Sequence, residues 1–344
     1  MNAFTADPQG WLTGHLEALC ACDSTSGAED AMLPALQALL RSIGAEVLEQ
    51  AVAPGRTNVL ATWGRPKVLF STHLDTVPPY LPPRLEGDAL FGRGACDAKG
   101  QILAQLGAVR RLLAESAEGL AWLGVVGEET DSAGARAALG LADRLGDLRA
   151  LINGEPTELK LATGQRGAQH LCLACAGRAA HSGSPERGHD AAWPLLDWLQ
   201  RLRALPGRTD SELGPEVWNL GRLQAGEALN AVPASAQADL LVRPVPGSTF
   251  AADARRLAPP EGSVTLRLDE PPDRYPRIPG FEHAPMPFGS DAPTLRALVP
   301  DRTVVLAGPG SIAVAHTLDE HLSLTDLLAG VELNHRLART FLDA

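Results

Sequence analysis

The chain has 344 residues, of which 45% are hydrophobic and 21% charged, so it is typical of a globular protein and long enough for two domains. Its formal net charge of −11 argues against non-specific binding to nucleic acid. The apolar runs are too short to cross a membrane, and residues 1–12 lack the basic region and apolar core of a signal peptide, so we expect a cytoplasmic protein.

The first 153 residues alternate between predicted helices and strands. The apolar periodicity predicts helices over residues 10–22, 29–43, 100–113 and 132–145, and strands over 45–52, 58–63, 68–72, 121–126 and 150–153. The continuous apolar run at 121–126 is typical of a strand buried on both faces. This alternation indicates the α/β class.

A different pattern begins near residue 166. Strands are predicted at 168–176, 217–224, 234–243 and 263–269, with helices at 188–204 and 249–257. The resulting order, β-α-β-β-α-β, is that of a ferredoxin-like unit. Cys172 and Cys175 form a CxxC sequence in the first of these strands, where residues three apart point to opposite faces. We therefore interpret both as structural cysteines.

The remaining residues return to the first domain. A proline-rich linker precedes a predicted helix at 292–299, a strand at 304–307 and a helix at 323–342. We expect a catalytic domain made of residues 1–166 and 278–344, interrupted by an inserted domain at 167–277.

Five candidate metal ligands follow predicted strands or glycine-rich turns: His73, Asp97, Glu129, Glu155 and His316. Ligand sites in open α/β sheets form beyond the carboxyl ends of the strands. Two histidines and three carboxylates suit two divalent metals better than one. Each residue taken singly has an ordinary alternative: a surface His, a helix cap at Asp97, a solvated acidic turn at Glu129, or a loop residue. Their joint placement favours the metal site.

Two further acidic residues lie beside these candidates. Asp75 is two residues after His73, so on an extended strand end both share a face, and the carboxylate can accept the second ring N–H. Glu128 and Glu129 are adjacent, so at a strand end their side chains point apart, and one can bind a metal while the other faces a metal-bound water. The free carboxylate can take the proton of that water and pass it to a leaving amine.

The motifs HLDTVP, GRGACDAKG, GEET, GEPT and AHTLDE occur in this order. They resemble the dinuclear zinc metallopeptidases and deacylases typified by carboxypeptidase G, aminoacylase and succinyl-diaminopimelate desuccinylase. The resemblance implies a zinc-peptidase-like catalytic domain, with a mixed sheet flanked by helices, and an inserted ferredoxin-like α+β lid. It also implies a homodimer formed through that lid.

The resemblance further implies two divalent metal ions, zinc first, with cobalt or manganese as alternatives. His73, Asp97 and Glu155 would hold one ion, and Asp97, Glu129 and His316 the other, with Asp97 bridging. Glu128 would be the general base and Asp75 the partner of His73. A cis peptide bond between Asp97 and Ala98 is implied as well.

The strings GRAAHSG, NLGRLQAGEALNAVP and GPGSIAVAHTLDEHL are most similar to acetylornithine and acetylcitrulline deacetylases. The resemblance implies that His181 polarises the scissile carbonyl, in dimeric members from the neighbouring subunit, and that Arg243 grips a substrate carboxylate. Asn230 and the backbone of Gly308 are further candidates. FGSDAP departs from the Thr-Glu-Ala of those deacetylases, which makes Ser290 a candidate for substrate recognition. A loop histidine and a salt bridge remain the alternatives for His181 and Arg243.

These observations predict a hydrolase that attacks an amide with metal-bound hydroxide and releases a free amino acid from a small N-acyl amino acid, such as N-acetylornithine or N-acetylcitrulline. The alternatives are a dipeptidase or exopeptidase, and a hydrolase releasing lysine or ornithine from an amino-group carrier protein. A catalytically silent binding homologue is the alternative from another class.

Overall fold

The computed structural model describes residues 7–343 and divides the chain into two compact units. Unit 1 contains the residues up to 163, residues 275–284 and those from 290 onward, and unit 2 contains residues 164–274 and 285–289. We expected the segments of the catalytic domain to end at residue 166 and to resume at residue 278. In the structure the first segment of unit 1 ends at residue 163 and the next begins at residue 275. Residues 285–289 belong to unit 2, because Gly289 lies against Arg166 and Ala168 of that unit.

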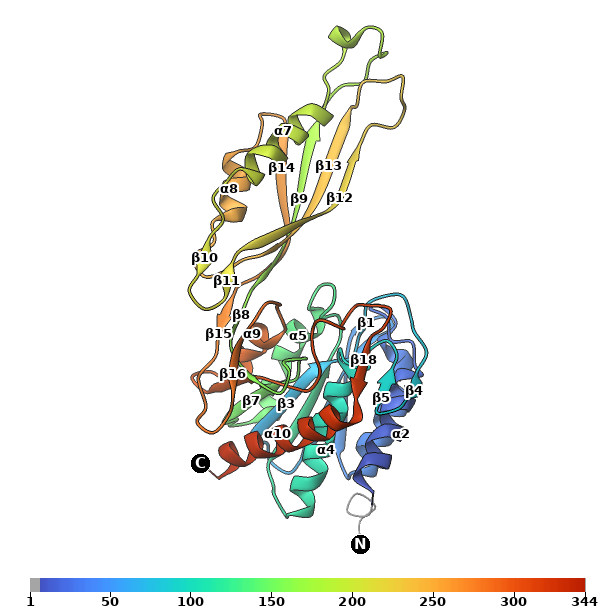
Figure 1. Ribbon diagram of the computed structural model, residues 1–344, viewed down its shortest axis with the longest axis vertical. Coiled ribbons are helices and arrows are strands. Elements are labelled where there is room, and N and C mark those ends of the chain that lie inside the picture. Colours follow the sequence, from blue (N-terminus) through green and yellow to red (C-terminus); the bar gives the residue numbers. More distant parts are fainter. Residues whose placement is uncertain (1–6, 344) are drawn as a thin grey trace. The chain divides into compact units, whose positions relative to one another are not determined.

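Unit 1 is built around a six-stranded mixed sheet in the order β1-β2-β6-β3-β7-β17 (Figure 1). Its strands are β1 (Glu46–Ala53), β2 (Arg56–Trp63), β6 (Leu120–Val125), β3 (Val68–His73), β7 (Ala150–Asn153) and β17 (Thr303–Leu306). β6, β3, β7 and β17 run parallel, and β1 and β2 form an antiparallel edge. Every position of β3 and β6 is buried, as expected of strands covered on both faces.

The helices of unit 1 pack on this sheet and on one another. They are α2 (Pro8–Cys20), α3 (Leu33–Ser42), α4 (Lys99–Ala114), α5 (Ala133–Ala138), α6 (Ala142–Leu145), α9 (Ala292–Leu295) and α10 (Leu324–Leu342). Local capping fixes where the long ones begin: Asp7 accepts a hydrogen bond from Gly10 N at 2.8 Å, and Ser323 accepts one from Asp326 N at 2.9 Å. The mixed sheet with its helices confirms the predicted fold class.

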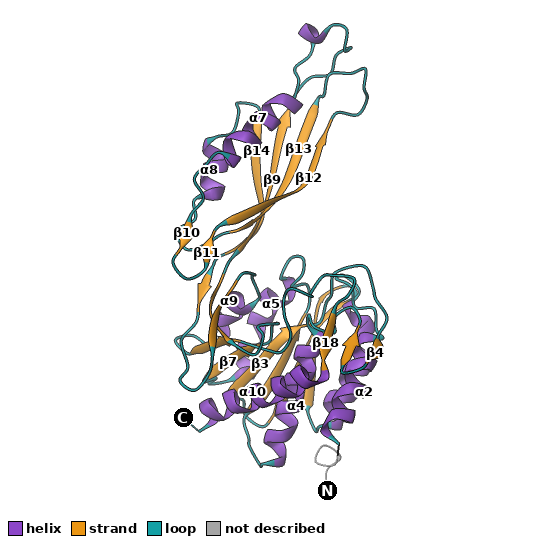
Figure 2. Cartoon of the chain, in the orientation of Figure 1, coloured by secondary structure: helices purple, strands orange, loops and turns teal. Residues whose placement is uncertain are grey.

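Unit 2 is a β-α-β-β-α-β arrangement. β9 (Ala168–Ala176), β12 (Val217–Ala225), β13 (Ser235–Arg243) and β14 (Gly262–Glu270) form an antiparallel sheet in the order β12-β13-β9-β14. Figure 2 shows α7 (Ala192–Arg203) and α8 (Phe250–Arg256) on the same side of this sheet. A separate core lies between them, with Leu171, Trp198 and Leu240 fully buried.

Several short elements are not apparent in the sequence pattern. They are the strands β4 (Arg84–Glu86), β5 (Ala89–Phe91), β8 (Leu161–Gln165), β10 (Thr209–Asp210), β11 (Gly214–Pro215), β15 (Asp273–Arg274), β16 (His283–Met286) and β18 (His321–Ser323), and the 3-10 turns at 29–32, 139–141, 185–187 and 296–298. The helix predicted over 132–145 is divided into α5, a 3-10 turn and α6. Gly140 lies in that turn, where glycine weakens a continuous helix.

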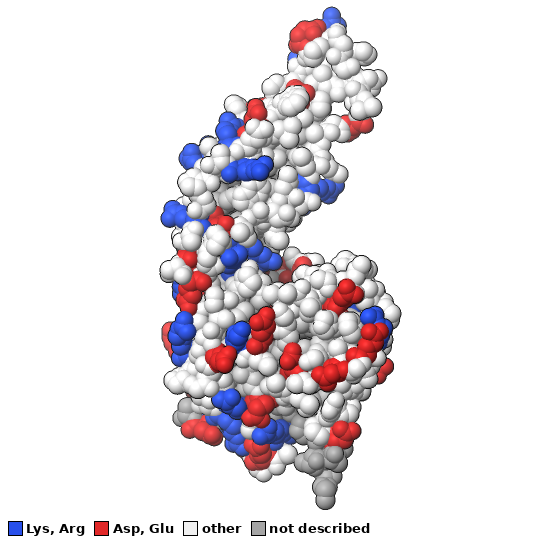
Figure 3. Space-filling view, viewed as in Figure 1, with Lys and Arg blue, Asp and Glu red and all other residues white. Residues whose placement is uncertain are grey.

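Among the described residues, no helix is long and apolar enough to cross a membrane. The expectation that no signal peptide precedes the first helix rests partly on residues 1–6, which lie outside the described residues. On the face drawn in Figure 3, acidic and basic side chains are interspersed over the surface of unit 1.

Candidate metal centre

The candidate ligands collect where the parallel strands of unit 1 end. β3 ends at His73, β6 precedes the turn that carries Glu129, and β7 precedes Glu155. Because β3 pairs in parallel with both β6 and β7, these three strand ends lie at one edge of the sheet. β17, parallel to β7, leads into the loop that carries His316.

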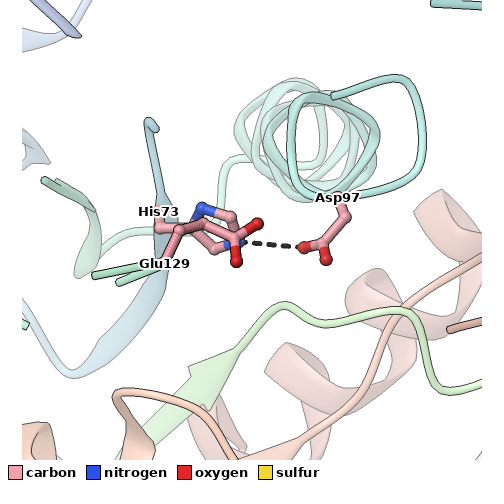
Figure 4. A group of neighbouring side chains, drawn as sticks. All are labelled: His73, Asp97 and Glu129. Atoms are coloured by element: carbon pink, nitrogen blue, oxygen red, sulfur yellow. Dashed lines mark hydrogen bonds and ion pairs between the residues drawn. The ribbon is translucent and has the colours of Figure 1, made fainter. Parts of the chain in front are cut away.

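Three ligand candidates form a compact group, His73, Asp97 and Glu129, in which one ligand atom of each lies within 4.8 Å of the others (Figure 4). His73 Nε2 is 2.9 Å from Asp97 Oδ1. Asp97 lies in the turn before α4, whose N-cap is Ala98 and has no side-chain hydrogen bond. The capping alternative for Asp97 is therefore excluded, and its carboxylate is available to the group.

His316 joins this group from the loop after β17. Its Nε2 lies 2.8 Å from Glu129 Oε1 and 3.3 Å from Asp97 Oδ2. The backbone of His316 has a φ of 63°, a left-handed conformation that is uncommon for residues other than glycine. Such conformations persist where the surrounding structure fixes them, often at functional sites.

Glu155 is the fifth candidate and is 4% exposed, which excludes the surface alternative. The backbone around it is tied to β3, because Thr72 Oγ1 donates to Gly154 O at 2.9 Å and Gly154 N donates to Ser71 O at 2.8 Å. Burial raises the pKa of Glu155 well above its usual value, and the negative charges of Asp97 and Glu129 raise it further against the attraction of His73. Glu155 lies outside the compact group of His73, Asp97 and Glu129, and its charge interacts with theirs.

Asp75 contacts His73 through both its backbone and its carboxylate, and the carboxylate has further partners. The ring Nδ1 of His73 lies 2.9 Å from the backbone carbonyl oxygen of Asp75, and the nearer carboxylate oxygen is 3.5 Å away. The carboxylate also accepts hydrogen bonds from the successive backbone N–H groups of residues 127, 128 and 129 at 3.0–3.1 Å, and from Ser26 Oγ at 2.7 Å. Asp75 thus fixes the turn that presents Glu128 and Glu129.

Glu128 is partly buried beside the group. Burial raises its pKa well above the usual value, and the charges of Glu155 and Glu129 add to the effect. The helix that follows is served by another residue, since Asp131 Oδ1 accepts from Ala133 N at 3.1 Å. Asp131, and not Glu128, is therefore the acidic residue that opens α5. Glu128 lies beside the ligand candidates.

The electrostatics of the group favour cations. Burial and the neighbouring Asp97 raise the pKa of Glu129, while hydrogen bonds to Asp97 and Glu129 raise the pKa of His316 to about 10. The acidic groups repel one another, and the imidazoles offset this only in part. A set of imidazole nitrogens and carboxylate oxygens with excess negative charge fits divalent cations such as zinc, cobalt or manganese.

The peptide bond between Asp97 and Ala98 is cis, as the resemblance implies. Two residues that sequence reasoning missed hold the surrounding turn from outside it, Gln101 of α4 and Glu320. Gln101 Nε2 donates to Cys96 O at 3.0 Å and to Pro309 O at 2.8 Å. Glu320, 1% exposed, accepts backbone hydrogen bonds from the same turn. The only signal for Glu320 in the sequence is its place at the end of AHTLDE.

Two residues that were predicted to contact substrate, Gly308 and Ser290, make hydrogen bonds within the protein. Gly308 N donates to Thr157 Oγ1 at 2.9 Å, and Gly308 O accepts from Leu159 N at 2.9 Å. The glycine is needed because a Cβ there would lie 2.7 Å from Glu155 O. Ser290 is 1% exposed, and its Oγ accepts from Ala292 N at 3.3 Å at the start of α9. The backbone of Gly308 and the side chain of Ser290 therefore serve the fold of unit 1.

The remaining candidates lie in unit 2. His181 and Asn230 are exposed neighbours, since Ser182 N donates to Asn230 O at 2.9 Å and His181 Nδ1 accepts from Gly183 N at 3.1 Å. Arg243 ends β13 and is partly buried, yet among residues 7–343 its guanidinium has no hydrogen-bond or ion-pair partner. The salt-bridge alternative for Arg243 is thus excluded among the described residues.

The fold and the donor set together define a metal-dependent hydrolase of amide bonds. The family model for peptidase family M20/M25/M40 matches residues 69–340. The chain belongs to this family.

Curated relatives extend the match over almost the whole chain. A peptidase M20 domain-containing protein of Schizosaccharomyces pombe is 34% identical over 330 residues, which cover 92% of this chain and 81% of the relative. A probable carboxypeptidase of Aspergillus clavatus is 33% identical over 368 residues, which cover 94% and 81%.

Solved structures share the fold. An M20 family metallo-carboxypeptidase of Sulfolobus solfataricus superposes with a TM-score of 0.77 at 16% identity and covers 100% of both chains. A dinuclear metal-binding M20 peptidase of Bacillus subtilis superposes with a TM-score of 0.70 at 17% identity and covers 97% of this chain and 98% of that one.

Proposed function

We propose that the protein hydrolyses the amide bond next to a free carboxylate, releasing an amino acid from an N-acyl amino acid or a dipeptide. The observation that carries the proposal is the group of His73, Asp97, Glu129 and His316, with Glu128 on the turn that also carries Glu129. Among N-acyl amino acids, N-acetylornithine and N-acetylcitrulline are the first substrates we expect. The curated relatives that are named probable carboxypeptidases favour the dipeptide as the second.

Two divalent ions, zinc first, are proposed here. His73, Asp97 and Glu155 would hold one ion, and Asp97, Glu129 and His316 the other. Bound there, the ions would acidify a water molecule and polarise the scissile carbonyl. Glu128 takes the proton of the attacking water as the new carbon–oxygen bond forms. It returns that proton to the nitrogen as the carbon–nitrogen bond breaks, so that a free amine and a carboxylate result.

Arg243 supplies the proposed specificity for a free carboxylate. A guanidinium can make two parallel hydrogen bonds to a carboxylate, and a partly buried one without a protein partner is favourably placed to do so. Such a group is costly to bury unpaired. We expect its partner to be the carboxylate of the amino acid that is released.

His181 is proposed to donate to the oxyanion of the transition state. His181 and Asn230 lie by the loop that precedes β13, whereas Arg243 lies at the end of that strand. The nine residues of β13 span roughly 27 Å at about 3.3 Å per residue, farther than a small substrate can reach. His181 and Arg243 of one chain therefore cannot contact the same substrate, which favours a homodimer in which His181 serves the partner chain.

The surface of unit 2 offers a place for a second copy. β12 is an edge strand of its sheet, with Leu220 and Leu223 40% and 44% exposed. Unpaired edge strands with exposed apolar side chains readily pair with another chain. We propose β12 as part of the dimer contact.

A substrate panel tests the proposed function. Free amine release is measured for N-acetyl amino acids and dipeptides with added zinc or cobalt, and each substrate is compared with its carboxamide, which lacks the free carboxylate. We expect turnover of the free acids and at least a tenfold loss with the carboxamides, because Arg243 would lose its charged partner. Equal rates for acid and carboxamide would contradict the role of Arg243. No turnover by protein with two bound ions would favour a silent binding homologue.

A further inference from the structure

Glu320 is a buried carboxylate that holds the turn of Asp97. Its Oε1 accepts hydrogen bonds from the backbone N–H groups of Gly94, Cys96 and Asp97 at 3.0, 3.2 and 3.1 Å. Its Oε2 is paired with Arg93 Nη1, and both side chains are almost fully buried. A carboxylate that accepts several backbone hydrogen bonds inside the protein fixes the conformation of that backbone.

The same residue anchors the loop of His316. Glu320 follows His316 by four positions, and its backbone carbonyl accepts from Gly92 N at 3.0 Å. Glu320 therefore joins the turn of Asp97 to the loop of His316 through both its side chain and its backbone. The distance between these two ligand candidates depends on this connection.

The two proposed metal positions differ in how their ligands are held. His73 ends β3 and Glu155 follows the neighbouring strand β7, and the two strands are hydrogen-bonded up to the site. His316, in contrast, lies in a loop, has a left-handed backbone, and its side chain is 47% exposed. The metal position formed by Asp97, Glu129 and His316 is therefore held less firmly by the sheet than the position formed by His73, Asp97 and Glu155.

We propose that Glu320 is a positioning residue for the metal held by Asp97, Glu129 and His316. It fixes the approach of His316 to Asp97, and its loss weakens that position more than the other, which keeps His73 and Glu155. This inference rests on the proposed function, because it requires the two-metal assignment. Asp75 provides a precedent within the same site, since its carboxylate holds the turn of Glu128 and Glu129 by three backbone N–H groups in the same way.

Two substitutions separate positioning from folding. Glu320→Ala removes both carboxylate oxygens and leaves Arg93 its hydrogen bond to Pro79 O but no ion-pair partner. Glu320→Gln keeps the shape and one carbonyl oxygen for the turn but loses the charge. Gln101, which bridges Cys96 and Pro309, holds the first part of the His316 loop in both variants. Glu115→Ala is the matched control, because Glu115 also joins distant elements, α4 to α10, at the other end of α4.

The experiment is a titration of the metal-free full-length protein with cobalt, followed by absorption spectroscopy and by competition with a chelator. We expect two ions in the wild-type protein and in Glu115→Ala. In Glu320→Ala the ion held by Asp97, Glu129 and His316 should bind about 10–100-fold more weakly, which is the usual effect of losing a residue that orients a ligand. The other ion shares Asp97 but keeps His73 and Glu155, so its affinity should fall less. Glu320→Gln should show a smaller loss at the same position.

Other outcomes are decisive as well. Equal weakening of both ions, or of neither, in Glu320→Gln would overturn the positioning role. If Glu320→Ala does not fold, as thermal unfolding will show, Glu320→Gln alone decides. Fewer than two ions in the wild-type protein would overturn the two-metal assignment, and the role of Glu320 with it. Two ions bound with equal affinity by the wild type and by every variant would overturn the role of Glu320 alone.

Discussion

In unit 1 His73, Glu129 and Glu155 lie at or just beyond the ends of buried strands. Internal carboxylates hold the turns of Asp97 and Glu129. In unit 2 His181 and Asn230 lie on exposed loops, and only Arg243 ends a strand. Unit 1 is thus preorganised for the reaction, as catalysis by fixed charges requires. In unit 2 most of the groups proposed to recognise the substrate lie on exposed loops, where substitutions have little effect on stability.

The same contrast appears in the cores. Strands of unit 1 are buried on both faces, and the interior holds polar side chains such as Thr72 of β3 and Gln105 of α4, each with a backbone partner. The sheet of unit 2 is covered by helices on one side only. A substitution in the core of unit 1 is therefore expected to disturb chemistry and stability together, and one in the core of unit 2 to disturb stability alone.

The largest effect is expected for Glu128→Gln. The variant keeps its backbone bond to Asp75 but cannot accept a proton, so kcat should fall about 10²–10⁴-fold. Metal analysis should still find the wild-type number of ions. Glu129→Gln is the control, since it removes a proposed ligand and should lower the number of bound ions. Wild-type activity in Glu128→Gln would show that another residue is the base.

A core substitution in unit 2 sharpens the contrast. Trp198 is fully buried and donates from Nε1 to Ala254 O at 3.0 Å, so Trp198→Ala should destabilise unit 2 by about 3–5 kcal/mol. Hydrogen exchange should accelerate in β9 and β13, while cobalt affinity stays within twofold of wild type. The matched control is Trp193→Ala in the same helix, since Trp193 is 66% exposed and its loss should cost less than about 0.5 kcal/mol. A loss of cobalt affinity of more than twofold in Trp198→Ala would show that metal binding in unit 1 depends on the stability of unit 2.

The smallest of these effects is expected for His181→Ala, which should lower kcat about 100-fold with little change in metal content. Mixing this variant with Glu128→Gln should restore activity, because a mixed dimer has one site with both residues intact. His189→Ala, in the same unit and also exposed at its side chain, should keep wild-type activity. Failure of mixed dimers to recover activity would place His181 in the site of its own chain.

The sequence predicted the main strands and helices because their apolar patterns reflect burial. Short strands such as β8 and β16 were missed, since their pairing depends on a partner far away in the chain. The roles of Asp75 and Glu320 could not be predicted for the same reason: their partners are backbone N–H groups, which carry no sequence signal. A glycine such as Gly308 indicates a close approach, but only the structure identifies Glu155 and Gln101 as the neighbours.

The insertion of unit 2 between the two segments of unit 1 has a consequence for synthesis. β3, β6 and β7 are made before unit 2, whereas β17, His316 and Glu320 are made after it. Domains fold as units while the chain emerges, so unit 2 can fold while the sheet of unit 1 still lacks its β17 edge. His316 and Glu320 are therefore synthesised after the other ligand candidates. Binding of the second ion then becomes one of the final steps of maturation.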